Sequence, residues 1–356
     1  MKSLKVLVLA DAKSFHTERF VGELSKQGCE VKLVSLEQGE IEHHLLERKG
    51  SIRQLHYYRS IKEIVSVVNQ HQPDIISAHF ASGYGHLAAK VSQKTDVPYT
   101  VHLWGSDILI VPDKSFLHKM KTVKALKHAS YIFGDSDYLL NEARKLFPFT
   151  HSKMIVWGVE ERYLSMHKSS YKLIEPLRVI VPRAHEDVYN NLFIVSALQD
   201  LIRENRISIT FPSFGSKYES FKQESEKIVG DNIQFYDKKL RADYLQFAST
   251  FDIYLSASRS DSSPVSLIEA LALGLIPVAA DIVGVQEWLS ANNGFLFTQD
   301  DKNSLRGIFE KILNTTDDMA EIRKGNLSKV KSSAIFEQNI RQQIDIFNQV
   351  VRGEIG

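Results

Sequence analysis

The chain has 356 residues, enough for two ordinary domains that each bury a core. Its formal net charge of +1 at pH 7 gives no overall attraction to a polyanion, so the composition argues against a nucleic-acid partner. The single cysteine, Cys29, excludes an internal disulfide and fits a reducing compartment, so we expect a cytoplasmic protein.

The first half of the chain alternates short apolar runs with helical patterns, as at residues 17–27 and 61–69. The runs typical of buried strands are Lys5–Leu9, Val31–Ser35, Asp74–Ala78, Tyr99–Leu103, Tyr131–Phe133 and Met154–Val156. The first run stops at Asp11 without a small-residue cleavage site, so it predicts a strand rather than a signal peptide. No apolar run in the sequence approaches the roughly 20 residues that span a bilayer.

The second half begins a new series of strands after the polar stretch at residues 165–176. Its apolar runs are Leu177–Val181, Ile207–Phe211, Ile233–Phe235, Asp252–Ala257, Ile276–Ala280 and Phe295–Phe297. Strands that alternate with helices predict parallel sheets covered on both faces, and the fresh start predicts two such domains. Ligands of open parallel sheets bind at the carboxyl ends of the strands, so we expect the site in a cleft between two facing sheets.

One segment of the second half combines a strand, an acidic loop, a helix start and a second strand. Ser263 fits the N-cap of the helix, Pro264 fits its first position, and Gly274 is placed to end it. Two carboxylates, Asp261 and Glu269, lie eight positions apart across the helix start.

This segment favours a ligand with a phosphate at one end and sugar hydroxyls at the other. The N–H groups of a helix start can hold a phosphate, and carboxylates accept hydrogen bonds from hydroxyls. The alternative is an ordinary strand–loop–helix–strand unit, in which Asp261 caps the loop and Glu269 lies on a solvated face.

The same segment resembles the donor-site signature of the family 4 glycosyltransferases, which have the GT-B fold. In that signature two acids eight positions apart flank a turn. They are followed by an Ala-rich helix, a Gly, a Pro-Val strand, and a further Gly and Glu. The matching positions are Asp261, Pro264, Glu269, Ala270, Gly274, Pro277, Val278, Asp281, Gly284, Glu287, Asn293 and Gly294. The chain departs from the signature where the first acid is Asp rather than Glu, and where Ser262-Ser263 replaces the usual Gly-Phe.

The resemblance implies an α/β GT-B fold, with two Rossmann-like domains whose parallel sheets face each other across a cleft. Residues 1–170 would form the acceptor side and residues 171–335 the donor side, and a helix within 336–356 would pack back on the first domain. The resemblance further implies a retaining, metal-independent, hexosyltransferase-type enzyme. Such an enzyme takes a UDP-sugar or a GDP-sugar as substrate and needs no cofactor.

The resemblance assigns the donor contacts as well. Glu269 would accept hydrogen bonds from the ribose, the helix start would receive the pyrophosphate together with Arg183, and Asp261 would bind hydroxyls of the transferred sugar. The residues expected to bind the nucleotide are Arg183, Ser263, Pro264, Val265, Ser266 and Glu269.

Arg183 follows the first strand of the second domain, and its guanidinium suits two phosphate oxygens. The alternative is a surface arginine at a strand end. The family usually has a lysine about six residues later, where this chain has Tyr189-Asn190, so half of the cationic clamp is absent from this loop. The candidates to replace the lysine are Lys217, Lys238 and Lys239.

In the first domain the fourth strand runs into TVHLWGSD, where the family has a His, a Gly and an Asp close to the transferred sugar. Either His102 or Trp104 takes the place of the family histidine, and alternation puts both on one face of the strand. Asp107 is a candidate contact for the acceptor or the sugar. The expected catalytic residues are thus Asp261, His102 and Asp107.

Two further loops of the first domain carry histidines. His16 contacts the acceptor or donor, or else has a capping or surface role, and the loop from His79 to His86 is a candidate acceptor site. Two histidines without carboxylate or thiolate partners do not predict a metal site.

Residues 114–128 form a basic, amphipathic helical pattern. One interpretation is a surface that rests on anionic lipid and makes the protein peripheral at the inner face of the membrane. The other is an ordinary helix with a solvated lysine face.

We therefore expect a glycosyltransferase that acts on a glycan or lipid-linked acceptor in cell-surface polysaccharide or glycoconjugate synthesis. Two alternatives remain open: a nucleotide-sugar epimerase of GT-B fold, and a non-catalytic nucleotide- or carbohydrate-binding protein. The absent lysine, and the lack of glycine in the loop after the first strand, motivate the second. The sequence leaves open the donor sugar and base, the acceptor, the pathway and the oligomeric state.

Overall fold

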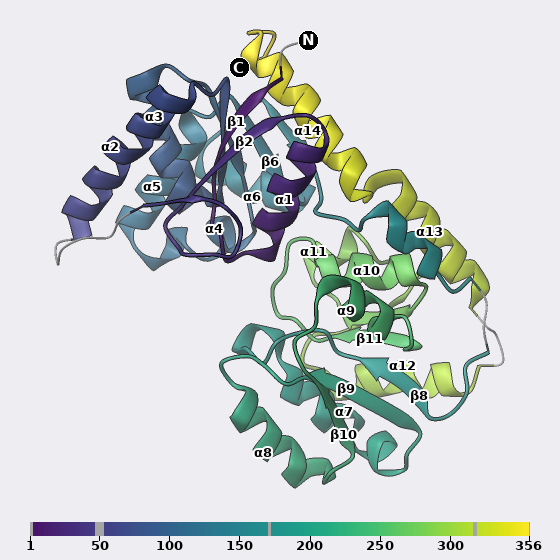
Figure 1. Cartoon of the computed structure of the whole chain (residues 1–356). Helices are drawn as coiled ribbons and strands as arrows, with labels where there is room; N and C mark the ends of the chain where they lie inside the picture. Colours follow the sequence, from purple (N-terminus) through teal and green to yellow (C-terminus); the bar gives the residue numbers. More distant parts are fainter. Residues whose placement is uncertain (1–2, 47–52, 170–171, 316–318, 356) are drawn as a thin grey trace. The chain divides into compact units, whose positions relative to one another are not determined.

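The computed structural model describes residues 3–46, 53–169, 172–315 and 319–355 (Figure 1). The chain divides into two compact units, one of Met1–Trp157 with Glu337–Gly356 and the other of Gly158–Phe336. The domain boundary expected between residues 170 and 171 falls outside the described residues. Val159 belongs to the second unit, where its N–H donates to the Ala334 carbonyl and its carbonyl accepts from the Phe336 N–H.

The first unit is built on a seven-stranded, wholly parallel sheet in the order β3-β2-β1-β4-β5-β6-β7. Its strands are β1 (Lys5–Leu9), β2 (Glu30–Ser35), β3 (His44–Leu45), β4 (Ile75–His79), β5 (Tyr99–His102), β6 (Tyr131–Gly134) and β7 (Ser152–Met154). Val6, Leu7, Val8 and Leu9 in β1 are fully buried, as expected for a parallel strand covered on both faces.

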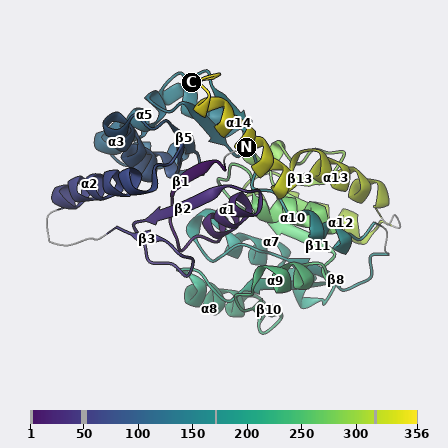
Figure 2. The same ribbon diagram turned by 45° about the horizontal axis from the view of Figure 1, so that its top comes forward.

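Helices cover both faces of this first sheet. They are α1 (Phe15–Lys26), α2 (Arg53–His71), α3 (His86–Thr95), α4 (Ser106–Leu109), α5 (Phe116–Lys127), α6 (Asp137–Leu146) and α14 (Phe336–Val351). Helices α2, α3 and α5 lie on one side of the sheet, and α1 and α14 lie on the other (Figures 1 and 2). A π-helix, η1 (Phe80–Gly85), joins β4 to α3, and a 3-10 turn, η2 (Pro112–Lys114), precedes α5.

The second unit has a six-stranded parallel sheet in the order β10-β9-β8-β11-β12-β13. Its strands are β8 (Leu177–Ile180), β9 (Ile207–Pro212), β10 (Ile233–Tyr236), β11 (Ile253–Ser256), β12 (Ile276–Ala280) and β13 (Phe295–Phe297). Its helices are α7 (Asn191–Arg203), α8 (Tyr218–Val229), α9 (Arg241–Ala248), α10 (Val265–Leu273), α11 (Val283–Gln286), α12 (Lys302–Leu313) and α13 (Ala320–Ser333). Two 3-10 turns, η3 (Glu161–Met166) and η4 (Asp187–Tyr189), complete it.

The predicted α/β fold of two Rossmann-like, parallel-sheet units is confirmed. In the second unit the strand order reverses between β8 and β11, and in the first between β1 and β4. Loops at the carboxyl ends of strands separate at such a switch point and leave room for a ligand. The topology therefore points to the loops after β8 and β11, and to those after β1 and β4, as the places for a site.

Candidate functional site

The loop after β11 leads into α10, whose N-cap is Pro264. We predicted Ser263 at the cap, and this position is wrong by one residue. The Ser263 hydroxyl accepts a hydrogen bond from the Trp288 indole Nε1 at 2.9 Å and caps nothing. The predicted end of the helix is confirmed, because Gly274 takes the left-handed conformation with φ +80°.

The start of α10 presents backbone donors at the carboxyl edge of the sheet. The first N–H group to bond within the turn is that of Leu267, which donates to the Pro264 carbonyl at 3.0 Å. Val265 and Ser266 precede it and are half-buried. Their N–H groups occupy the positions from which a helix start holds an anion.

Arg183 and Asp261 come together at the switch point. Arg183 follows β8 and Asp261 follows β11, and the guanidinium Nη2 donates to the Asp261 Oδ2 at 2.6 Å. The two side chains are 12% and 19% exposed, so water screens the pair only partly. Arg183 is therefore not a surface arginine, and the carboxylate of Asp261 is occupied by a cation.

The Arg183 guanidinium has further neighbours on the second unit. Its centre lies 5.2 Å from the centroid of the Tyr189 ring, so the tyrosine that replaces the family lysine packs on the arginine. Burial is the largest influence and would lower the pKa of Arg183, but the Asp261 carboxylate, Tyr254 and Tyr189 together outweigh it, and the pKa is raised. The guanidinium stays charged, and its buried Nε has no hydrogen-bond partner among the described residues.

Glu269 lies inside the second unit, on the buried face of α10, where it is 5% exposed. The alternative that it lies on a solvated face is wrong. Its Oε1 accepts a hydrogen bond from the Arg241 Nη1, and Arg241 also donates to Glu160 through Nε and Nη2, at 2.8 and 2.7 Å. Glu160, Arg241 and Glu269 are called the Arg241 cluster below.

Sequence reasoning missed the Arg241 cluster. A signal was present for Arg241, since it ends a basic run that includes Lys238 and Lys239 just after β10, at the carboxyl edge of the sheet. Glu160 carried no signal, because its partner lies 81 positions away in the sequence.

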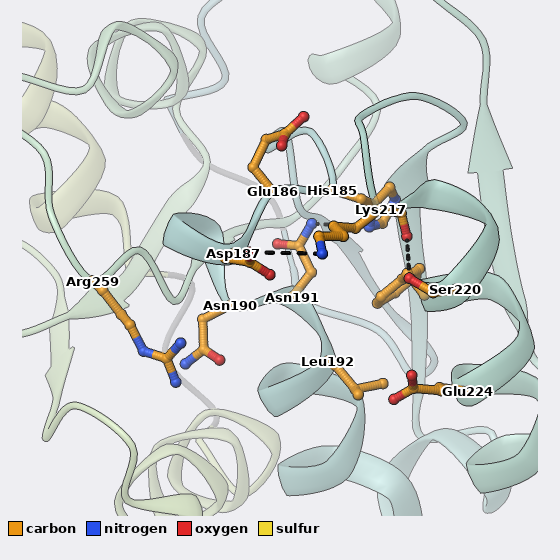
Figure 3. A pocket seen from close by; sticks show the side chains of 11 residues that line it. His185, Glu186, Asp187, Asn190, Asn191, Leu192, Lys217, Ser220, Glu224 and Arg259 are labelled. Atoms are coloured by element: carbon orange, nitrogen blue, oxygen red, sulfur yellow. Dashed lines mark hydrogen bonds and ion pairs between the residues drawn. The ribbon is translucent and has the colours of Figure 1, made fainter. Parts of the chain in front are cut away.

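Two of the candidate lysines, Lys217 and Lys239, contact groups other than Arg183. Lys217 lies on the surface with its ammonium 3.9 Å from Asp187, and Lys239 lies over the Phe247 ring at 5.0 Å. Lys217 and Asp187 point toward one another in a cavity of about 300 Å³ (Figure 3). None of the expected donor residues lines this cavity, and its lining carries charges of both signs, so we do not place the diphosphate there.

The candidates of the first unit form a buried aromatic cluster. His102, at the end of β5, stacks on His79 at 4.2 Å between ring centroids, and Gln343 of α14 contacts its ring nitrogens at 3.1 Å. The Trp104 Nε1 donates to the His79 Nδ1 at 3.3 Å. His79 therefore contacts both residues that could take the family histidine place, and its central position was not evident from the sequence.

These histidines are neutral at pH 7. Burial, with a smaller contribution from His16, lowers the pKa of His79 to about 3. Burial and the neighbouring His79 lower the pKa of His102 well below its ordinary value. His86 begins α3, and burial together with Lys121, Lys124 and Lys90 lowers its pKa to about 4.

Asp107 is fully buried in α4. Its Oδ2 accepts from the Ala81 N–H at 2.7 Å and its Oδ1 from the Trp104 N–H at 2.9 Å. Burial raises its pKa to about 6 against the effect of these backbone hydrogen bonds. Asp107 thus joins the loops after β4 and β5, and a contact with the acceptor or the sugar stays a prediction.

Two other expectations concern His16 and a metal. His16 lies within α1 and belongs to the same cluster, with its ring 5.1 Å from that of Trp157 and 5.8 Å from that of Trp104. Among the described residues, no three His, Cys, Asp or Glu side chains are grouped so that they could hold a metal ion.

The basic stretch at residues 114–128 contains helix α5, as its pattern predicts. Thr122, Ala125 and Leu126 are its buried residues. Its first turns instead expose large apolar side chains: Phe116 is 82%, Leu117 53% and Met120 50% exposed. In the part of the chain that the structure describes, no helix is long and apolar enough to cross a membrane.

Two family models match the chain. Residues 5–136 match the model described as "Glycosyl transferase 4-like", and residues 175–315 match "Glycosyl transferases group 1". Over 221 residues the chain is 29% identical to TuaC of Bacillus subtilis (strain 168), whose name assigns it to teichuronic acid biosynthesis as a glycosyltransferase. The match covers 60% of this chain and 54% of TuaC, so it spans about half the length of that relative.

Solved structures share the fold at low sequence identity. HepE of Anabaena, solved in complex with UDP and glucose, has a TM-score of 0.79 and 16% identity, over 97% of this chain and 100% of that one. A sucrose-phosphate synthase from Thermosynechococcus elongatus has a TM-score of 0.79 and 14% identity, over 98% and 100% of the two chains. At these identities the likeness shows the GT-B fold of two parallel-sheet units.

Proposed function

The chain belongs to the group 1 glycosyltransferases, with a family 4-like first half, and on this premise we propose that it moves a sugar from a nucleotide-sugar donor to a glycan or lipid-linked acceptor. The observation that carries the proposal is the meeting of Arg183, Asp261 and the start of α10 at the switch point of the second sheet. HepE, of the same fold, was solved with UDP and glucose, which supports a nucleotide-sugar donor. The name of TuaC supports a role in cell-surface polysaccharide synthesis.

The diphosphate of the donor would displace a contact that is already formed. Arg183 stays charged and is held by Tyr189, so phosphate oxygens can take the place of the Asp261 carboxylate. The N–H groups of Val265 and Ser266 would bind the same diphosphate. Asp261, released from the arginine, could then accept hydroxyls of the transferred sugar.

The chemistry proposed is transfer with retention of configuration and without a metal ion or cofactor. The bond between the anomeric carbon and the phosphate oxygen breaks, and the nucleoside diphosphate leaves with the electron pair. The acceptor oxygen attacks from the same face, and its proton passes to the departing phosphate. Arg183 and the start of α10 would stabilise the leaving-group charge, so catalysis depends on positioning and electrostatics.

The first unit would serve the acceptor. His102 and Asp107 are buried, and both contact the groups that shape the loops after β4 and β5. We propose that they hold those loops, and Trp104 in particular, in the arrangement that receives the acceptor.

We also propose that α5 contacts the membrane, which would make a cytoplasmic protein peripheral at the inner face. Phe116, Leu117 and Met120 are exposed on the same short helix as Lys119 and Lys121. Exposed apolar side chains insert at the headgroup boundary, and lysines are attracted to anionic lipid. The alternative, an ordinary helix with a solvated lysine face, gives no reason for the exposure of Phe116.

The test is release of the nucleoside diphosphate. The full chain is first screened for binding of UDP, GDP and ADP by thermal shift, because a ligand of the native state raises the melting temperature. Sugar nucleotides of the bound base are then incubated with and without lipid and glycan acceptors from a bacterial envelope. Acceptor-dependent release of the diphosphate supports a transferase.

Each alternative predicts another result. An epimerase would convert the nucleotide sugar with no acceptor present. A non-catalytic protein would bind the nucleotide sugar without turnover in any mixture. Failure of all three nucleotides to bind would overturn the proposal.

A further inference from the structure

The Arg241 cluster is a buried arrangement of two carboxylates around one guanidinium. The side chains of Arg241, Glu160 and Glu269 are 12%, 11% and 7% exposed. Arg241 donates from Nε and Nη2 to Glu160 and from Nη1 to Glu269, so its planar guanidinium binds both carboxylates at once.

Three separate segments of the second unit build the cluster. Glu160 precedes η3, Arg241 opens α9, and Glu269 lies within α10. The buried Tyr163 ring lies 5.9 Å from the Arg241 guanidinium and closes a further side. The guanidinium is therefore held from several directions, and its orientation fixes that of the Glu269 carboxylate.

The charge of the cluster indicates what it can bind. Two carboxylates share one guanidinium here, so hydrogen-bond acceptors line this buried place. A phosphate would be repelled, whereas a neutral group with O–H donors would be accepted. Among the described residues, the hydrogen bond to Glu269 uses one oxygen, Oε1, so Oε2 remains to accept such a donor.

We propose that Arg241, anchored by Glu160, is the positioning residue that orients Glu269 to accept the ribose hydroxyls of the donor. The inference rests on the proposed function, because only a nucleotide donor would bring a ribose to Glu269, as the family resemblance implies. Arg241 itself touches no substrate. A lysine cannot replace it fully, since one ammonium lacks the planar fork that reaches both carboxylates.

The experiment compares two ligands that differ only in the ribose hydroxyls. The probe is whichever of UDP, GDP and ADP binds the full chain, measured by calorimetry beside its 2′,3′-dideoxy analogue. We expect the wild-type protein to favour the ribonucleotide by about tenfold or more, as for hydrogen bonds to a charged group. Arg241→Met should reduce this preference to nearly one by weakening ribonucleotide binding alone.

Further variants separate positioning from general damage. Arg241→Lys should retain part of the preference and Glu160→Gln should lose part of it. Arg206→Met is the matched control, because it breaks another arginine–glutamate pair of the same unit, with Glu175, at the opposite end of the strands. The control should leave the preference unchanged. If Arg241→Met does not fold, Arg241→Lys and Glu160→Gln decide the matter.

The outcomes distinguish the two proposals. If Glu269→Gln abolishes the preference while folded Arg241→Met keeps it, the positioning role is wrong and the ribose contact stands. If Glu269→Gln also keeps the preference, the ribose contact itself is wrong and the inference falls with it. A preference that is undiminished in both Arg241→Lys and Glu160→Gln overturns the positioning role, and so does the absence of any nucleotide binding.

Discussion

The ion pair between Arg183 and Asp261 makes a strong prediction about stability and binding together. Arg183→Met removes the guanidinium and leaves a mostly buried carboxylate without its cation. Asp261→Asn leaves the guanidinium without its anion. The double variant Arg183→Met/Asp261→Asn leaves neither charge, so it should be less destabilised than the sum of the two single variants.

The magnitude follows from the burial of the pair. Breaking a fully buried pair costs about 3–5 kcal/mol and an exposed pair about 0–1 kcal/mol. The side chains of Arg183 and Asp261 are 12% and 19% exposed, so the pair is closer to a buried pair than to an exposed one. Each single variant should therefore lower the free energy of unfolding by about 3 kcal/mol. For a unit of this size the melting temperature should fall by about 6–12 °C. The coupling energy between the two changes should be about 2 kcal/mol.

The assay is denaturant unfolding of the four proteins of the cycle, with nucleoside diphosphate affinity measured on each. Arg183→Met should weaken diphosphate binding at least tenfold. Asp261→Asn should strengthen it a few-fold, because the carboxylate no longer competes for the arginine. If the stability losses of the two single variants add up to that of the double variant within about 0.5 kcal/mol, the two side chains do not stabilise each other. If Asp261→Asn binds the diphosphate more weakly than the wild-type protein, Asp261 does not compete with the diphosphate for Arg183.

Three further predictions address other parts of the chain. The first unit should lose stability in acid, because His79 and His102 are neutral in the folded state and must take up protons. Their pKa values lie below the ordinary 6.5, so their contribution to the free energy of unfolding is fully present above pH 6.5. It is lost as the pH falls, down to about pH 3 for His79. His79 should cost about 2 kcal/mol at pH 5, and His102 acts in the same direction. Asp107, whose pKa is raised to about 6, acts in the opposite sense between pH 6 and 3.8. His102→Phe should reduce the fall in melting temperature between pH 7.5 and 5, and an unchanged slope would contradict this. The triple variant Phe116→Ser/Leu117→Ser/Met120→Ser should lose sedimentation with phosphatidylglycerol vesicles but not nucleotide binding, whereas retained sedimentation would rule out α5 as the contact. Gly274→Ala should cost about 1–3 kcal/mol more than Gly28→Ala in denaturant unfolding, because both glycines end a helix with positive φ but only a Cβ at Gly274 meets a backbone oxygen, that of Lys168; equal losses would show that this close approach does not matter.

The sequence by itself determined the parallel-sheet units and the position of helix α10. Alternating strands and helices are local sequence patterns, and so is the helix end at Gly274. Each depends on residues a few positions apart, so it can be predicted without knowing which distant residues it will contact. The short strand β3 was not predicted, because its two residues, His44 and Leu45, are too few to show an alternation of apolar and polar positions. The approach of Arg183 to Asp261 followed from topology, since both lie at the carboxyl ends of neighbouring strands.

Only the tertiary structure decided what the polar side chains do. Ser263 bonds Trp288 rather than capping α10, Asp107 accepts two backbone N–H groups, and Glu269 faces Arg241 instead of solvent. Apart from the Trp104 N–H, three residues before Asp107, each of these partners lies at least 25 residues away in the sequence. The choice of partner depends on how buried charges and donors are satisfied across the whole unit. Local patterns set which residues form the elements, but the pairing of buried polar groups is a property of the packed chain.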